Sequence, residues 1–483
     1  MKDTNFAENK ELNIWEALIP IIALVILLAY NVFQYGDDAL SGSNQFILLI
    51  GAAVAAIVGF RNKVSYNTMM LEVGNNFKST TGAIIILLFV GALAGTWLIS
   101  GIIPSMIYYG LLLLNPSIFL PATIIICAII SVATGSSWTT SATVGIALIG
   151  IGQAISIPVG MTAGAVISGA YFGDKMSPLS DTTNLAPAMA GGELFSHIRY
   201  MTYTTVPSIV ITIIIFTILG LVRDTTGLTD SSEILQAIRE SFHISPWLFL
   251  VPGVVVILIM KRTKPIVALF VGTILGGIFA LIFQPAIVAS ITGSETLTME
   301  AAYKGIMNAM TVDTAIVTSS QELNDLFTSG GMSGMMGTIW LIMCALVFGG
   351  VMDAIGALAV ISNALLKMAT SVFGLFASTV ASCLAINVTA SDQYLALVVP
   401  GKMFAQAYKD RGLAPENLSR TLEDSGTVTS VLVPWNTCGA YQSGVLGVST
   451  FEYMFYAIFN YISPFMTLLF AAFQIKIKQL VTE

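Results

Sequence analysis

The chain has 483 residues, of which 55% are hydrophobic and only 10% are charged, and its formal net charge is −7. Because soluble domains carry roughly 25% charged residues, this composition excludes a soluble enzyme or binding module. The negative net charge and the absence of a long Lys/Arg run argue against nucleic-acid binding. We therefore expect one all-α, polytopic membrane domain over residues 1–483, with the lipid bilayer as its solvent.

Apolar stretches follow one another along the whole chain. A helical span needs about 20 apolar residues, and some of these stretches are shorter or interrupted. They lie at 14–33, 45–60, 83–99, 101–114, 117–133, 142–172, 203–222, 246–260, 265–283, 335–350, 372–387, 394–408 and 451–475. Together they predict about 11–14 membrane segments, including re-entrant ones that enter and leave on the same side.

Positive residues in short connections predict the orientation, because cytoplasmic loops are enriched in Lys and Arg. Such residues are Arg61, Lys63, Lys78, Lys261, Arg262, Lys264, Lys409, Arg411, Arg420, Lys476 and Lys478. The connection 34–44 has Asp37 and Asp38 but no Lys or Arg, so we expect it outside. This pattern predicts a multi-pass protein of the cell (inner, cytoplasmic) membrane with both termini in the cytoplasm.

Two parts of the chain interrupt their apolar pattern in the same order. The first part has TGSSWTTSAT at 134–143 and then GDKMSPLSDTTNLAP at 173–187. The second has NVTASDQ at 387–393 and then EDSGTVTSVLVPWNTCGAYQSG at 423–444. Paired interruptions of this kind are typical of a transporter's binding site, because freed backbone groups are tolerated only inside protein or beside a water-filled cavity. Ordinary polar loops outside the membrane are the alternative interpretation.

The segment GAVISGAYFGDKMSPLSDTTNLAPAMAGGELFSHIRYM (164–201) resembles the signature region of the NhaC family of sodium/proton antiporters. The segments TGSSWTTSATVG and EDSGTVTSVLVPWNTCG resemble the same family in order and spacing. The resemblance implies two inverted repeats, approximately 83–222 and 335–475, each with a re-entrant hairpin followed by a discontinuous helix. By the same resemblance, 134–143 and 387–393 would be the hairpin tips.

The polar breaks supply the oxygen atoms that a sodium ion prefers as ligands. We predict a Na⁺ site between the repeats near mid-membrane, and no resident cofactor. Its candidate ligands are Thr134, Ser136, Ser177, Ser180, Thr182, Thr183, Asn184, Asn387, Thr389, Ser391, Ser425, Thr427 and Asn436.

Four carboxylates inside the breaks, Asp181, Asp424, Asp392 and Asp174, are the candidates for coupling cation and proton movement. Charges at membrane depth are costly and usually functional. An Asp that holds either a proton or a sodium ion is the minimal antiport mechanism. The two histidines, His197 and His243, lie near segment ends, where we expect surface or interfacial positions.

Structural roles are the alternatives for these charged residues. Asp181 and Asp424 would cap half-helices. Asp174 would pair with its neighbour Lys175, and Glu423 would pair with Arg420, three residues earlier on a helix.

The predicted function is secondary active sodium/proton antiport, with sodium ions, protons and the bilayer as partners; a homodimer stays open. The alternative is a sodium- and proton-coupled exchanger of small carboxylates, of the malate/lactate type that the family also contains. An anion carrier should offer a positive group, and Lys175 and Lys402 are candidates. An enzyme is not expected, because no HExxH, GxSxG or phosphate-loop motif is present. A passive channel is disfavoured by the two-halved pattern.

Overall fold

The computed structural model describes residues 12–35, 39, 42–113, 115–222, 231–261, 263–318, 324 and 327–480. The described chain is helical, apart from a two-stranded antiparallel sheet of β1 (Thr314–Ala315) and β2 (Thr328–Ser329). The predicted all-α class is therefore confirmed. Both ends of the chain, residues 1–11 and 481–483, lie outside the described residues. Asp37, Asp38 and Arg262, which entered the orientation prediction, lie outside them as well.

The first half contains the first two predicted breaks. Its helices are α1 (Ile14–Tyr35), α2 (Ser43–Arg61), α3 (Tyr66–Ile99), α4 (Ile102–Leu113), α5 (Pro116–Thr134), α6 (Ser137–Thr140), the π-helix η2 (Ser141–Gly145), α7 (Ile146–Ala154), α8 (Val159–Met176), α9 (Asp181–Ala190) and α10 (Leu194–Val222). The chain thus leaves the α-helical path after Thr134 and again after Met176.

A middle section and the second half follow. The middle helices are α11 (Ser231–Ser241), η3 (Pro246–Phe249), α12 (Leu250–Met260), α13 (Pro265–Phe283), α14 (Pro285–Ile291) and α15 (Met299–Thr311). The second half has α17 (Gly331–Gly334), α18 (Met336–Ala354), α19 (Ala357–Lys367), α20 (Val372–Thr389), α21 (Gln393–Asp410), α22 (Pro415–Leu422), the π-helix η4 (Glu423–Thr427), η5 (Ser430–Leu432), α23 (Thr437–Leu446), α24 (Thr450–Tyr453), η6 (Met454–Tyr456) and α25 (Ile458–Ala472).

Eight helices in the described chain are long and apolar enough to cross a bilayer, and two bent pairs raise the number to ten. The predicted 11–14 segments included re-entrant ones, which this number leaves out. The stretch 101–114 forms the 12-residue helix α4, which is too short to span alone. The stretch 142–172 is divided among η2, α7 and α8, and 394–408 lies in the Pro-interrupted helix α21. The protein is nevertheless a multi-pass membrane protein.

Capping side chains explain where the broken helices restart. Ser180 accepts a hydrogen bond from the Thr183 amide at the start of α9, and Asn436 accepts one from the Cys438 amide at the start of α23. Such caps satisfy amides that a helix start leaves free. The Ser/Thr/Asp-rich composition of the breaks thus both ends one helix and begins the next.

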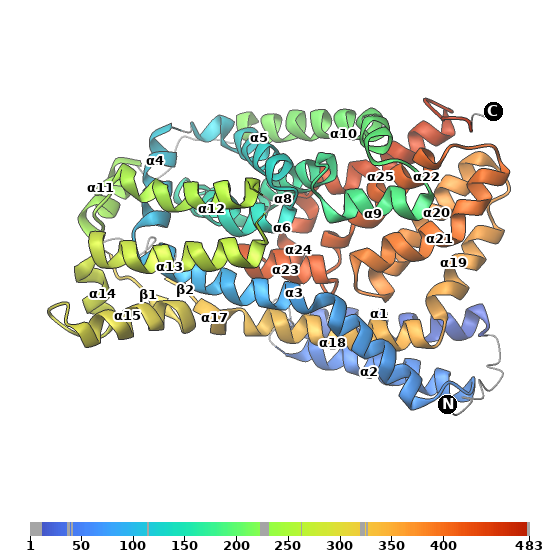
Figure 1. The fold of residues 1–483 in the computed structure, drawn as a ribbon, viewed down its shortest axis with the longest axis horizontal. Coiled ribbons are helices and arrows are strands. Elements are labelled where there is room, and N and C mark those ends of the chain that lie inside the picture. Colours follow the sequence, from blue (N-terminus) through green and yellow to red (C-terminus); the bar gives the residue numbers. More distant parts are fainter. Residues whose placement is uncertain are drawn as a thin grey trace.

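The long helices α3, α10, α13 and α18 run roughly along the longest axis of the molecule (Figure 1). Helices α11, α14 and α15 and the small sheet lie toward one end of this axis, and α19 to α22 lie toward the other. Helix α5 packs closely along α8, where a Cβ atom on Gly173 would come within 2.5 Å of the Ala128 carbonyl oxygen. This close approach brings the end of α8 beside the first break.

The C-terminal segment 473–480 returns to α10 and α22. The Tyr200 hydroxyl donates to the Lys476 carbonyl, and the Asn417 amide donates to the Lys478 carbonyl at 2.7 Å. The Lys478 ammonium also lies 2.6 Å from the Glu416 carboxylate. We call residues 473–480 the C-terminal strap; it holds α22, which continues directly into η4.

Candidate functional site

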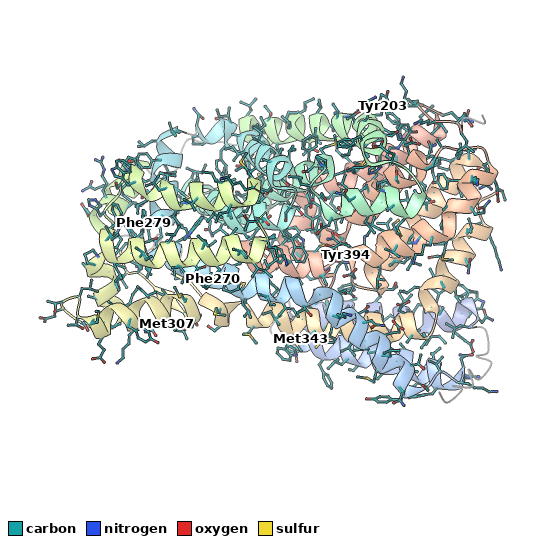
Figure 2. The ribbon with its side chains drawn as sticks, in the orientation of Figure 1. Tyr203, Phe270, Phe279, Met307, Met343 and Tyr394 are labelled. Atoms are coloured by element: carbon teal, nitrogen blue, oxygen red, sulfur yellow. The ribbon has the colours of Figure 1, made fainter. Side chains whose placement is uncertain are left out.

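A cavity of about 620 Å³ opens where the four predicted breaks meet. Its lining comes from residues 134–136, 138–139, 174 and 178–182 in the first half, and from 392–394 and Thr437 in the second half. Residues 79–80, 82–83 and 86 of α3 and residues 259 and 263–265 complete it. Tyr394, one of the lining residues, lies near the middle of the long axis (Figure 2). Segments more than 200 residues apart in the sequence therefore share one space.

Three of the four predicted coupling carboxylates line this cavity, and their surroundings differ. Asp174 accepts hydrogen bonds from the Ser137 amide at 3.1 Å and the Ser137 hydroxyl at 2.7 Å. Asp392 caps α21 by accepting from the Tyr394 and Leu395 amides at 2.8 and 3.0 Å. Hydrogen bonds from the protein thus occupy at least one oxygen of each of these two carboxylates.

Asp181 is the exposed carboxylate of the three and the first residue of α9. Ser180, not Asp181, provides the cap, so the capping alternative for Asp181 is wrong. Within the described part of the chain, no hydrogen bond or ion pair engages its carboxylate. It is therefore available to a ligand in the cavity.

Hydroxyl groups lie beside these carboxylates. Of the predicted ligands, Thr134, Ser136, Ser180 and Thr182 line the cavity. The Ser180 and Thr182 oxygens are 3.1 Å apart, and Ser136 caps α6. The cavity thus combines carboxylate and hydroxyl oxygens, the donor set that suits a hard cation.

Most of the other predicted ligands hold the breaks in place. The Ser177 hydroxyl donates to the Val132 carbonyl at 2.8 Å, and the Thr183 hydroxyl donates to the Lys175 carbonyl at 3.1 Å. The Asn184 amide donates to the Ser180 carbonyl at 2.7 Å. These bonds tie the segment 177–184 to α5, to the end of α8 and to itself.

The second half uses its amides in the same way. The Asn387 amide donates to the Gly426 carbonyl at 2.7 Å, and the Asn436 amide donates to the Asn387 carbonyl at 3.1 Å. The Ser425 hydroxyl donates to the Thr421 carbonyl at 2.5 Å. By contrast, three of the predicted ligands, Thr389, Ser391 and Thr427, have buried hydroxyls without a hydrogen-bond partner.

Asp424 lies away from the cavity, in a fully buried ion pair with Lys175. Thr204 donates to the same carboxylate at 2.8 Å, and Thr467 donates to it as well. The expected pairing of Asp174 with Lys175 is therefore wrong, as is capping by Asp424, which lies within η4. Adjacent residues on a helix point about 100° apart, so Asp174 faces the cavity while Lys175 faces the interior.

The predicted pairing of Glu423 with Arg420 is also wrong. Both side chains are completely buried, yet Glu423 accepts no hydrogen bond and Arg420 donates none. The Arg420 guanidinium lies over the ring of Tyr200, 4.5 Å from its centre. The helix changes from α to π at Glu423, so the usual three-residue spacing no longer places the two side chains on one face.

The predicted surface or interfacial position of His197 is also wrong. It is fully buried, with Nδ1 at 2.7 Å from the Ser419 hydroxyl, whereas His243 is exposed as expected. A single helical face of α10 carries His197 and Tyr200 toward α22. Their polar partners on α22 lie over 200 residues away in sequence, so no local pattern indicated this contact.

A tryptophan from the first break closes one side of the cavity. Trp138 stacks on Tyr441 of α23, with ring centres 4.0 Å apart, and the Tyr441 hydroxyl donates to the Trp138 carbonyl at 3.2 Å. The Trp435 indole donates to the Val388 carbonyl at 2.8 Å. The first contact joins the two halves beside the cavity, and the second braces the second break.

Known proteins resemble this chain over most of its length. The Na⁺/H⁺ antiporter family matches residues 169–475. The chain is 39% identical over 423 residues to the Na⁺/H⁺ antiporter NhaC of Alkalihalophilus pseudofirmus, covering 88% of each chain. It is 37% identical over 454 residues to the malate-2H⁺/Na⁺-lactate antiporter of Bacillus subtilis, covering 93% of this chain and 90% of that one. It is 32% identical over 470 residues to the arginine/ornithine antiporter ArcD of Halobacterium salinarum, covering 96% and 93%.

Proposed function

The chain belongs to the Na⁺/H⁺ antiporter family, and from this we propose that it exchanges sodium ions for protons across the cytoplasmic membrane, with both termini on the cytoplasmic side. It is a transporter and not an enzyme. The identity of the transported ions is the proposed part, because the relatives named above differ in their substrates.

The observation that carries the proposal is the charge of the cavity. Among the described residues, three carboxylates, Asp174, Asp181 and Asp392, line it, against one ammonium, that of the exposed Lys264. A concave site dominated by one sign of charge between low-dielectric walls attracts the opposite ion. The hydroxyls of Ser180 and Thr182 add uncharged oxygen ligands to it.

Exchange follows from competition at these carboxylates. Carboxylates that share a site repel one another, so binding of either a proton or a sodium ion relieves the repulsion. A sodium ion that enters displaces a proton, and the return step reverses this. Asp181 carries this role in the proposal, with Asp392 as its counterpart from the second half. Asp424 is already paired with Lys175, so in this proposal it supports the structure around the site and does not bind the exchanged ions.

We also propose that the halves 83–222 and 335–475 are inverted repeats that move relative to each other. Each half contains a helix that stops at a polar tip, at Thr134 and at Thr389, and then a second interruption, at 176–181 and at 423–437. Movement of one half against the other would expose the cavity to each side in turn.

Exchange of small organic ions is the second candidate function, favoured by the malate/lactate relative at 37% identity. Lys264 offers such a carrier a positive group in the lining of the cavity. The two lysines suggested by the sequence offer less support: the pair with Asp424 neutralises Lys175, and Lys402 does not line the cavity.

Purified protein in liposomes with a pH dye inside tests both functions. With an acidic interior, external sodium should raise the internal pH as protons leave. Lithium and potassium, and then malate, lactate, arginine and ornithine, are added in separate runs. Sodium alone moving protons supports the proposal. A response that needs an organic ion supports the second candidate, and no response to sodium under any condition refutes sodium/proton exchange.

A further inference from the structure

Glu423 is a completely buried carboxylate that the described polar groups do not satisfy. Neither of its oxygens accepts a hydrogen bond, and it takes part in no ion pair. Lys175, the lysine near it in the described chain, is already paired with Asp424. Buried carboxylates are normally paired, hydrogen-bonded, protonated or bound to a metal ion. Glu423 therefore needs a partner beyond these side chains.

The groups around Glu423 favour a cation as that partner. Its carboxylate lies near Lys175 and Asp174 of α8 and near the hydroxyls of Thr427 and Thr182, without a hydrogen bond to any of them. Thr427 is one turn further along η4, and its own hydroxyl is buried without a hydrogen-bond partner. A carboxylate and an unpartnered hydroxyl on the same turn thus both have unused oxygen lone pairs.

The π-helix changes the side chains that Glu423 lies beside. Short π-helical segments inside α-helices occur frequently at functional sites. Glu423 and Thr427 are four residues apart and share a side of η4. In a regular α-helix, Glu423 would instead point along the same face as Arg420.

Thr182 connects this position to the cavity. It lines the cavity and also faces the Glu423 carboxylate. Its hydroxyl lies 3.1 Å from the Ser180 hydroxyl, which faces the cavity as well. Thr182 therefore borders both the cavity and the Glu423 carboxylate, where α9 packs against η4.

On the basis of the proposed sodium transport, we propose that Glu423, Thr427 and Thr182 form an inner sodium site behind the cavity. This site is separate from Asp181, which belongs to the cavity. It joins the two halves, because Thr182 comes from α9 and the other two residues come from η4. A sodium ion bound there would hold α9 against η4.

Equilibrium binding of radioactive ²²Na⁺ to the purified, full-length protein in detergent tests the proposal, with choline replacing sodium in the blanks. We expect Glu423→Gln, which keeps the shape but removes the charge, to lose one bound sodium ion per chain. We expect Thr427→Val to raise the half-saturating sodium concentration at least 5-fold, and Thr427→Ser to restore it. Glu416→Gln on α22 is the matched control, since Glu416 pairs with Lys478 at the strap, and it should bind sodium as the unmodified protein does.

The outcomes separate this inference from the proposed function. If the unmodified protein binds no sodium, the proposed function itself fails. If it binds sodium, and Glu423→Gln and Thr427→Val bind with unchanged stoichiometry and half-saturation, the inner site is refuted and Glu423 is a neutral, protonated acid. The size-exclusion profile of each variant checks its folding. If Glu423→Gln misfolds, the half-saturating sodium concentrations of Thr427→Val and Thr427→Ser decide whether the inner site exists.

Discussion

Asp181 is the cavity carboxylate that neither a cap nor an ion pair holds, so its replacement should affect exchange more than folding. We expect Asp181→Asn to abolish sodium-driven proton movement in liposomes while the protein purifies normally, because an amide cannot cycle a proton. Glu193→Gln is the matched control: Glu193 is exposed and accepts from the Phe195 and Ser196 amides, outside the cavity. Near-normal exchange by Asp181→Asn, with an unshifted pH profile, would rule out its coupling role.

Thr182 should act through its oxygen atom. Thr182→Val keeps the shape but removes one ligand, so the half-saturating sodium concentration for exchange should rise several-fold, with little change in the maximal rate. Thr212→Val on α10 is the control, because the Thr212 hydroxyl is buried and bonded to the Ser208 carbonyl, away from the cavity. Equal sodium dependence in the two variants would mean that Thr182 only fills space.

The buried pair of Lys175 and Asp424 should contribute to stability when both partners are present. Lys175→Met leaves a buried carboxylate unpaired, a change that costs about 3–5 kcal/mol in proteins. The double variant Lys175→Met/Asp424→Leu removes both charges and should recover much of this loss. Thermal unfolding in detergent measures the three proteins. If the double variant is less stable than Lys175→Met by a further large step, Asp424 has a structural role through Thr204 and Thr467 instead.

At the scale of helices, the turn between α5 and α6 depends on Gly135. Its φ of 68° is left-handed, and a Cβ atom there would lie 2.6 Å from the Leu179 Cβ. Gly135→Ala should therefore lower both the unfolding temperature and the exchange rate, because the tip can no longer rest against 177–180. Gly191, with φ of 77° and no atom near its missing Cβ, is the control. Gly191→Ala carries only the backbone strain, about 1–2 kcal/mol. Equal losses in both variants would show that the contact with Leu179 is unimportant.

The helices that the sequence predicted well are those whose ends carry local signals. The interruptions at 134–143 and 173–187 were visible as polar runs inside apolar ones, and the structure breaks the helices there. The predicted 11–14 segments included re-entrant ones, whereas the described chain has eight to ten helices or bent pairs that could cross a bilayer. An apolar run alone does not show whether its helix is long enough to cross, as the 12-residue α4 illustrates.

The side-chain partners were predicted less well, because they come from distant parts of the chain. Asp174, Asp181 and Asp392 were identified from composition, and the structure brings them to one cavity. The pair of Lys175 with Asp424 joins residues 249 apart in sequence, which no local spacing can indicate. The alternative pairing of Glu423 with Arg420 rests on a spacing rule for α-helices, which the π-helix η4 does not obey.

Across the whole molecule, the C-terminal strap ties the last residues to the helix that precedes η4. Burial raises the pKa of the Glu416 carboxyl, but hydrogen bonds from Lys478 and Ser196 outweigh it and hold this pKa below its ordinary value. A carboxyl with a lowered pKa in the folded state stabilises the protein above its unfolded pKa of about 4.3 and loses this contribution as the pH falls.

Lys478→Met should therefore lower the unfolding temperature slightly at pH 7, by the equivalent of about 1 kcal/mol or less, because Lys478 is partly exposed. The difference from the unmodified protein should shrink as the pH falls below about 4.3, through the lowered pKa of Glu416 in the folded protein. Lys409→Met, an exposed lysine in the last turn of α21, is the control. A difference that stays constant across this pH range would mean that Lys478 acts through packing and not through Glu416.

The volume of the cavity bears on where an ion would lose its water. A space of about 620 Å³ has room for about 20 water molecules at roughly 30 Å³ each, so it can hold an alkali cation with its first hydration shell intact. The cavity itself therefore does not select lithium, sodium or potassium by size. In the proposed inner site, the ion would exchange water for the fixed oxygens of Thr182, Thr427 and Glu423, and the preference among these cations would be set at that step.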